Sequence, residues 1–161
     1  MGELQQNIIN SITRHYRKVG FLSDNNDGKL PLLLSGGVDS TLCGLVGHMM
    51  GLKPVCISYQ RENVYSRDCE QAEKTCQVMG WEFHKVVLPD EDPKEVFQKL
   101  TYEYGVAKKT ELEVLYPFLF LIDKIEELGF KKIVCGFNPS PDNRKHAIWN
   151  KQNSTEFWQY I

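Results

Sequence analysis

The sequence predicts an α/β fold, with a single doubly wound and mostly parallel sheet of about five strands and helices on both faces. Short apolar runs that suit buried strands alternate along the chain with longer segments whose apolar residues recur at helical spacing. Strands joined through helices need crossover connections, which make the strands parallel and cover both faces of the sheet. The length of 161 residues, 42% of them hydrophobic, suits one domain spanning residues 1–161.

The first segment, residues 1–29, is expected to form a helix and a polar turn. Apolar residues at helical spacing predict a helix over 3–19, which Gly20 can end. A short apolar run then predicts a buried strand over 30–34, and the tripeptide Ser35-Gly36-Gly37 follows it at once. From Leu42 to Met49 the pattern is helical again. This order of strand, glycine turn and helix opens the α/β core, residues 30–143.

The rest of the core continues the alternation. Strands are predicted over 54–59, 82–88 and 132–135, and helices over 67–79, 92–104 and from about Pro117 to Leu128. Gly80 and Gly129 can end two of these helices, with Pro117 in the first turn of the last one. The tail, residues 144–161, is rich in aromatic residues. We expect it to pack on this domain or to cover a second copy or a partner subunit.

Composition excludes several classes of protein. With 19 basic and 21 acidic residues, the formal net charge is -2. This overall charge does not favour binding to nucleic acid or to anionic lipid. No apolar run approaches the roughly 20 residues of a membrane-spanning helix. The five cysteines form no CxxC pair, and their odd number does not suit a complete set of disulfides. We predict a cytoplasmic protein that does not bind membranes, and its overall charge does not favour nucleic acid as a partner.

The segment Ser35-Gly36-Gly37-Val38-Asp39-Ser40-Thr41 carries the clearest functional signal. Two consecutive glycines permit positive φ and remove Cβ atoms, so backbone N–H groups can converge on an anion at the start of a helix. The hydroxyls add further donors, and Asp39 can hold a magnesium ion that bridges phosphate oxygens. The segment therefore predicts a phosphate-binding loop. A plainer interpretation is that two glycines only let a strand meet a helix.

The wider context favours the phosphate interpretation. Neither the dinucleotide-binding GxGxxG pattern nor the Walker A pattern can be written here. In letters and in its strand-loop-helix context, the segment resembles the PP-loop of the N-type ATP pyrophosphatases, whose signature SGGxDS is complete from Ser35 to Ser40. The resemblance implies an adenine nucleotide alpha hydrolase-like (HUP) fold. It also implies cleavage of ATP between its α and β phosphates, with adenylation of a substrate oxygen and attack by a nitrogen or sulfur nucleophile.

The same resemblance implies roles for particular residues. ATP would be held by the loop, by the second strand and by the end of the fourth strand, at Ser35, Gly36, Gly37, Val38, Asp39, Ser40, Thr41, Ile57, Ser58, Tyr59 and Gly136. Magnesium would be bound by Asp39 and Asp142. Arg144 and Lys145 would offset the charge that develops on pyrophosphate, although a solvated basic turn explains them equally well.

Within the superfamily, residues 69–88 look like the corresponding part of asparagine synthetase-like and 7-cyano-7-deazaguanine synthase-like (QueC-like) chains. Pro141-Asp142-Asn143-Arg144 is similar to the YPDCR segment of the latter, with Asn143 in place of the cysteine. The function predicted is therefore an ATP-dependent ligase that activates a small-molecule oxygen. Two alternatives stay open: a module that binds ATP or AMP without turnover, and sulfur transfer to tRNA through Cys135, a residue whose burial as an inert thiol is the simpler expectation.

Overall fold

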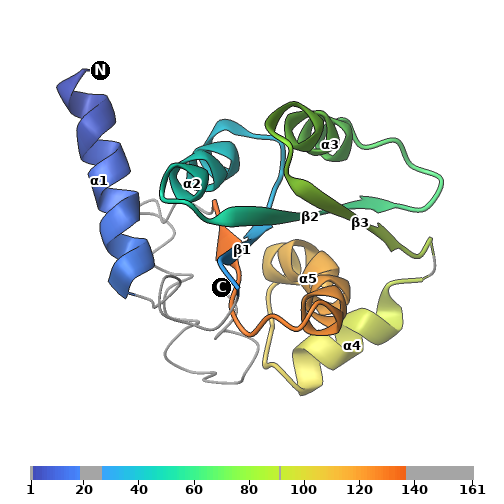
Figure 1. The fold of residues 1–161 in the computed structure, drawn as a ribbon. Helices are drawn as coiled ribbons and strands as arrows, with labels where there is room; N and C mark the ends of the chain where they lie inside the picture. Colours follow the sequence, from blue (N-terminus) through green and yellow to red (C-terminus); the bar gives the residue numbers. More distant parts are fainter. Residues whose placement is uncertain (1, 19–26, 91, 137–161) are drawn as a thin grey trace.

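The computed structural model describes residues 2–18, 27–90 and 92–136, which form one parallel sheet covered by helices (Figure 1). In chain order the elements are α1 (Glu3–Lys18), β1 (Lys29–Leu33), α2 (Val38–Met49), β2 (Lys53–Arg61), α3 (Arg67–Met79), β3 (Glu82–Leu88), α4 (Lys94–Tyr102), α5 (Lys109–Glu127) and β4 (Val134–Cys135). The predicted α/β class is confirmed. The described residues contribute four strands, where about five were expected.

The strand order is β3-β2-β1-β4, and all the pairs are parallel. The chain runs outward from β1 through β2 to β3, and then returns to place β4 on the other side of β1. The strand order therefore reverses between β1 and β4. In open α/β sheets, ligands bind beyond the carboxyl ends of the strands at such a reversal.

Alternate residues of the strands build two separate cores. Leu30, Leu32 and Leu34 face the layer of α2 and α3, where they pack with Cys56 and Trp81. On the opposite face, α5 lies beneath β2 and β3 (Figure 1). There the buried residues are Val55, Ile57, Leu121, Ile125, Phe130 and Ile133. Helices thus cover both faces, and the apolar runs of the strands reflect burial on two sides.

Helix α5 corrects one expectation from the sequence. Pro117 was expected in the first turn, but the helix begins at Lys109 and Pro117 lies inside it. The preceding turns are held by a small core in which Leu115 packs with Leu100 and Val106, residues of α4 and the connection that follows it. Burial of this apolar surface outweighs the hydrogen bond that the proline ring removes. The extra turns bring Glu113 and Val114 toward the sheet.

The other boundaries agree closely with the sequence. Helix α3 ends at Gly80, which has a left-handed φ of 65° and donates its N–H to the Cys76 carbonyl, as the predicted stop requires. Strand β2 extends to Arg61, two residues beyond the expected end. Within the described residues, no helix is both long and apolar enough to cross a membrane. The aromatic tail, residues 144–161, lies outside them.

Candidate functional site: a phosphate-binding loop beside a cavity

The loop follows the central strand β1 directly. The Leu34 N–H donates to the Ile57 carbonyl at 2.9 Å, which continues the pairing with β2 up to Ser35. Gly36 then takes a positive φ of 73°, a backbone conformation that glycine adopts without steric cost. Helix α2 starts two residues later, at Val38, and no side chain caps it at Gly37. The chain therefore reverses sharply and presents an uncapped helix start at the carboxyl edge of the sheet.

Three hydroxyl groups fix the shape of this loop. Ser40 Oγ accepts a hydrogen bond from the Ser35 N–H at 3.2 Å and lies 3.1 Å from Ser35 Oγ. Ser35 Oγ in turn accepts a hydrogen bond from the Gly37 N–H at 3.4 Å. The hydroxyls of Ser40 and Thr41 donate to the Gly37 carbonyl, at 3.3 and 2.8 Å. These bonds turn the Gly37 carbonyl toward α2, and the hydroxyl groups brace the loop itself.

Four N–H groups of the loop have no acceptor among the residues that the structure describes. They are the N–H groups of Gly36, Val38, Asp39 and Ser40. The last three belong to the first turn of α2, where the helix dipole also favours negative charge. A phosphate group is the chemical partner that several convergent N–H donors at a helix start fit best.

Two glycines allow other elements to approach the loop closely. A Cβ on Gly36 would lie 2.7 Å from the Asp68 carbonyl oxygen and 2.9 Å from Gln71 Cβ, so the loop packs directly on the first turns of α3. A Cβ on Gly136 would lie 2.4 Å from the Ser40 nitrogen. A side chain at that position would cover a free N–H of the loop. The close packing against Ser40 therefore gives a steric reason for a glycine at position 136, which the sequence predicted to help hold ATP.

A cavity of about 650 Å³ opens beside the loop. Its lining comes from the carboxyl-terminal parts of β1, β2 and β4, the starts of α2 and α3 and one side of α5: Leu33, Leu34, Ser35, Ser40, Ile57, Ser58, Tyr59, Ser66, Asp68, Glu113, Val114, Phe118, Leu121, Cys135 and Gly136. Its size is in the range of small-molecule and cofactor sites. The structure brings together here six of the predicted residues: Ser35, Ser40, Ile57, Ser58, Tyr59 and Gly136.

Other predicted residues lie elsewhere. Gly36, Gly37, Val38, Asp39 and Thr41 form the loop and the first turn of α2 beside the cavity rather than its lining. Asp142, Arg144 and Lys145 lie outside the described residues. Sequence reasoning did not select three polar residues of the lining, Ser66, Asp68 and Glu113. For the first two a signal was available. The position of a helix start directly after β2 was the available signal, because such starts gather at the carboxyl edge of a parallel sheet.

Electrostatic effects link the cavity residues. Burial and, second, the nearby Asp68 carboxylate raise the pKa of the Tyr59 phenol, so Tyr59 is neutral at physiological pH. Burial raises the pKa of the Cys69 thiol, while a hydrogen bond with Ser58 opposes this effect. Ser58 in the cavity lining therefore lies beside a thiol of α3.

The described residues include no group of three or more histidine, cysteine or acidic side chains that could enclose a metal ion. Asp39, exposed in the first turn of α2, is the carboxylate that the loop itself provides. Magnesium in nucleotide sites commonly takes one or two carboxylates together with phosphate oxygens and water. The donors that these described residues provide fit a magnesium ion that arrives with a nucleotide.

Comparison with known proteins adds independent evidence. No family model matches the chain. Mitochondrial tRNA-specific 2-thiouridylase 1 of Danio rerio is 35% identical over 90 residues, which cover 51% of this chain and 22% of that protein. Among solved structures, the glutamine-dependent NAD+ synthetase from Acinetobacter baumannii, in complex with ADP, matches with a TM-score of 0.56 and 16% identity, over 91% of this chain and 27% of that one.

The NH3-dependent NAD synthetase from Campylobacter jejuni subsp. jejuni NCTC 11168, in complex with the nitrate ion, matches with a TM-score of 0.50 and 16% identity, over 78% of this chain and 54% of that one. The chain thus spans about a fifth to a half of the length of these relatives. It has the fold of the NAD synthetases, and its signature loop stands where the central strand meets a helix. The HUP-like α/β fold that the sequence resemblance implies is therefore confirmed.

Proposed function

We propose that this protein binds ATP with magnesium and cleaves it between the α and β phosphates to activate an oxygen of a second substrate. The observation that carries the proposal is the set of four N–H groups, at Gly36, Val38, Asp39 and Ser40, that no described residue occupies. They open next to a cavity large enough for a nucleoside. In this arrangement the loop holds the phosphates and the cavity holds the adenosine.

Each part of the site has a task in this reaction. The N–H groups stabilise the negative charge that the pyrophosphate gains as it leaves, and they are fixed in place beforehand by the serine bonds of the loop. Asp39 would hold magnesium, which supplies further charge neutralisation when bound. The apolar wall of Ile57, Val114 and Phe118 excludes water from the ring of the nucleotide. The acceptor oxygen displaces pyrophosphate, and a nitrogen nucleophile then displaces AMP.

The direct test is product analysis with the full chain. Protein incubated with ATP, magnesium, ammonium and a panel of acceptors should release AMP and pyrophosphate, and Asp39→Asn should abolish the release. Asp123→Asn is the matched control, since Asp123 is an exposed carboxylate of α5 that does not line the cavity. Release of ADP and phosphate would contradict the proposal.

A second candidate is sulfur transfer through Cys135. Two observations favour it: the segment similar to the tRNA-specific 2-thiouridylase, and the position of Cys135 in the cavity lining, one residue before Gly136. It predicts that Cys135→Ser abolishes turnover. Cys56→Ser, which replaces a thiol buried in the core between the sheet and the layer of α2 and α3, should not abolish it. It also predicts binding of RNA despite the net charge of -2.

A binding module without turnover is the remaining alternative. The fold and the loop suit it equally, because they explain the capture of ATP and not the attack on it. ATP binding without AMP formation under any acceptor would favour it. Contact of the aromatic tail with a second copy or a partner subunit also stays a prediction, as does the cytoplasmic location.

A further inference from the structure

A glutamine of α3 lies against the phosphate-binding loop. A Cβ on Gly36 would lie 2.9 Å from Gln71 Cβ, so only the absence of a side chain on Gly36 allows this contact. Gln71 belongs to the second turn of α3, and Asp68, one turn before it, lines the cavity. Side chains on a helix point back toward the N-terminus of that helix. The amide of Gln71 is therefore directed along the loop toward the cavity.

The Gln71 amide is available for a ligand. The side chain is exposed, and no residue that the structure describes forms a hydrogen bond with its amide. On the same helix, Ala72 and Cys76 are buried in the core against the sheet, and Gln71 lies outside that core. The amide nitrogen offers N–H donors. They stand beside the N–H group of Gly36, which also has no described acceptor.

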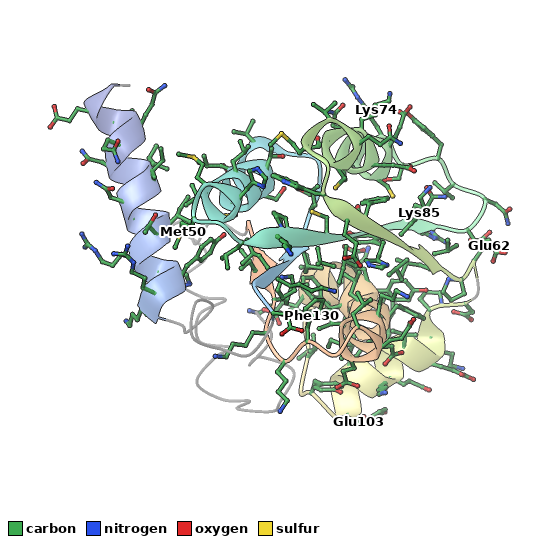
Figure 2. All side chains as sticks on the ribbon, in the orientation of Figure 1. Met50, Glu62, Lys74, Lys85, Glu103 and Phe130 are labelled. Carbon is green, nitrogen blue, oxygen red and sulfur yellow. The ribbon has the colours of Figure 1, made fainter. Side chains whose placement is uncertain are left out.

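The cations of α3 are less well placed to meet a phosphate. Its one lysine, Lys74, extends away from the sheet (Figure 2) and pairs with Glu70 at 2.8 Å. Arg67 is the first residue of α3, so its side chain points beyond the start of the helix. Within the described part of the chain, no lysine or arginine lines the cavity. Gln71 is therefore the donor of α3 nearest to the loop, and hydrogen bonds to an ionised acceptor are stronger than neutral ones.

We infer that the Gln71 amide donates a hydrogen bond to the β or γ phosphate of bound ATP, which makes Gln71 a phosphate-binding residue outside the loop. The inference rests on the proposed function, since it adds a residue to the site that holds ATP. Contact with Gly36 keeps this donor next to the loop. In the reaction, the same hydrogen bond stabilises the negative charge that pyrophosphate gains as it leaves.

Substitutions of both signs of charge test this hydrogen bond. Titration calorimetry measures the affinity for α,β-methylene-ATP with magnesium, in the full chain and in Gln71→Ala, Gln71→Lys and Gln71→Glu. We expect Gln71→Ala to bind about tenfold more weakly than the parent chain, because a hydrogen bond to a charged group is lost. Gln71→Lys should bind at least about tenfold more tightly than Gln71→Glu, because the first attracts the phosphates and the second repels them. A role in packing alone would weaken all three variants without this order.

Gln77 supplies the matched controls, because it is exposed on the same helix and does not line the cavity. Gln77→Ala, Gln77→Lys and Gln77→Glu carry the same changes of charge, and their affinities should stay within about twofold of the parent chain, since solvent screens a charge at that distance from the loop. Parent affinity in Gln71→Ala, equal affinities of Gln71→Lys and Gln71→Glu, or the same order of affinities among the Gln77 variants would overturn the inference. Failure of the parent chain to bind α,β-methylene-ATP would instead overturn the proposed function.

Discussion

Replacement of Gly36 by alanine tests the role of the loop most directly. Gly36 has a φ of 73°, where a side chain costs about 1–2 kcal/mol. The added Cβ would also lie 2.7 Å from the Asp68 carbonyl oxygen and 2.9 Å from Gln71 Cβ. Both neighbours belong to α3, so the loop and the helix have to separate. Overpacking of this kind costs a further 1–3 kcal/mol, roughly.

Gly80→Ala is the matched control. Gly80 has a similar φ of 65°, but no atom lies within 4 Å of the position that its Cβ would take. Its replacement should therefore cost only the conformational part, about 1–2 kcal/mol. The expected free energy of unfolding falls by about 2–5 kcal/mol for Gly36→Ala, so the two variants should differ by roughly 1–3 kcal/mol.

Urea denaturation at equilibrium measures this difference, and titration calorimetry with magnesium and α,β-methylene-ATP measures nucleotide affinity. We expect Gly36→Ala to bind the nucleotide at least about tenfold more weakly, because displacement of the loop moves its free N–H groups, and Gly80→Ala to bind normally. The reasoning is refuted if Gly36→Ala matches Gly80→Ala in stability and retains the affinity of the parent chain.

Three further predictions concern the surroundings of the loop. Gly136→Ala places a Cβ over the Ser40 nitrogen, so nucleotide affinity measured by calorimetry should fall about tenfold; unchanged affinity would show that this N–H is not used. Ser66→Ala removes the side chain that caps α3 and should lower the free energy of unfolding in urea by about 1 kcal/mol, whereas an unaltered transition would mean that the cap contributes nothing. Burial and the Asp68 carboxylate raise the pKa of the Tyr59 phenol, so folding favours its neutral form. The contribution of Tyr59 to the stability of the folded state is therefore complete below the ordinary phenol pKa, and it is lost as the pH rises through the raised pKa. Asp68→Asn should lower that pKa in an ultraviolet absorbance titration, and an unchanged titration would exclude the charge effect.

The sequence predicted the elements of the core well because their signals are local. The strand over 82–88 and the helix over 67–79 have the expected bounds, since apolar periodicity and the Gly80 stop are properties of neighbouring residues. The start of α5 was missed for the opposite reason. Packing of Leu115 against Leu100 and Val106 joins residues distant in the chain, and it overrides the local effect of Pro117.

The same distinction applies to the candidate site. The letters from Ser35 to Ser40 were sufficient to predict a phosphate-binding loop and its place between a strand and a helix. They could not predict that Asp68 and Glu113 face the cavity, because these residues reach it from two helices whose packing on the sheet decides their position.

What the sequence determined by itself was therefore the succession of strands and helices and the chemistry of one continuous loop. Both depend on residues a few positions apart, whose backbone preferences and hydrogen bonds act locally. Only the tertiary structure decided the strand order, which places Gly136 against Ser40 and forms a cavity from six separate elements. The order arises from burial of apolar surface between segments distant in the chain, and no local pattern encodes it.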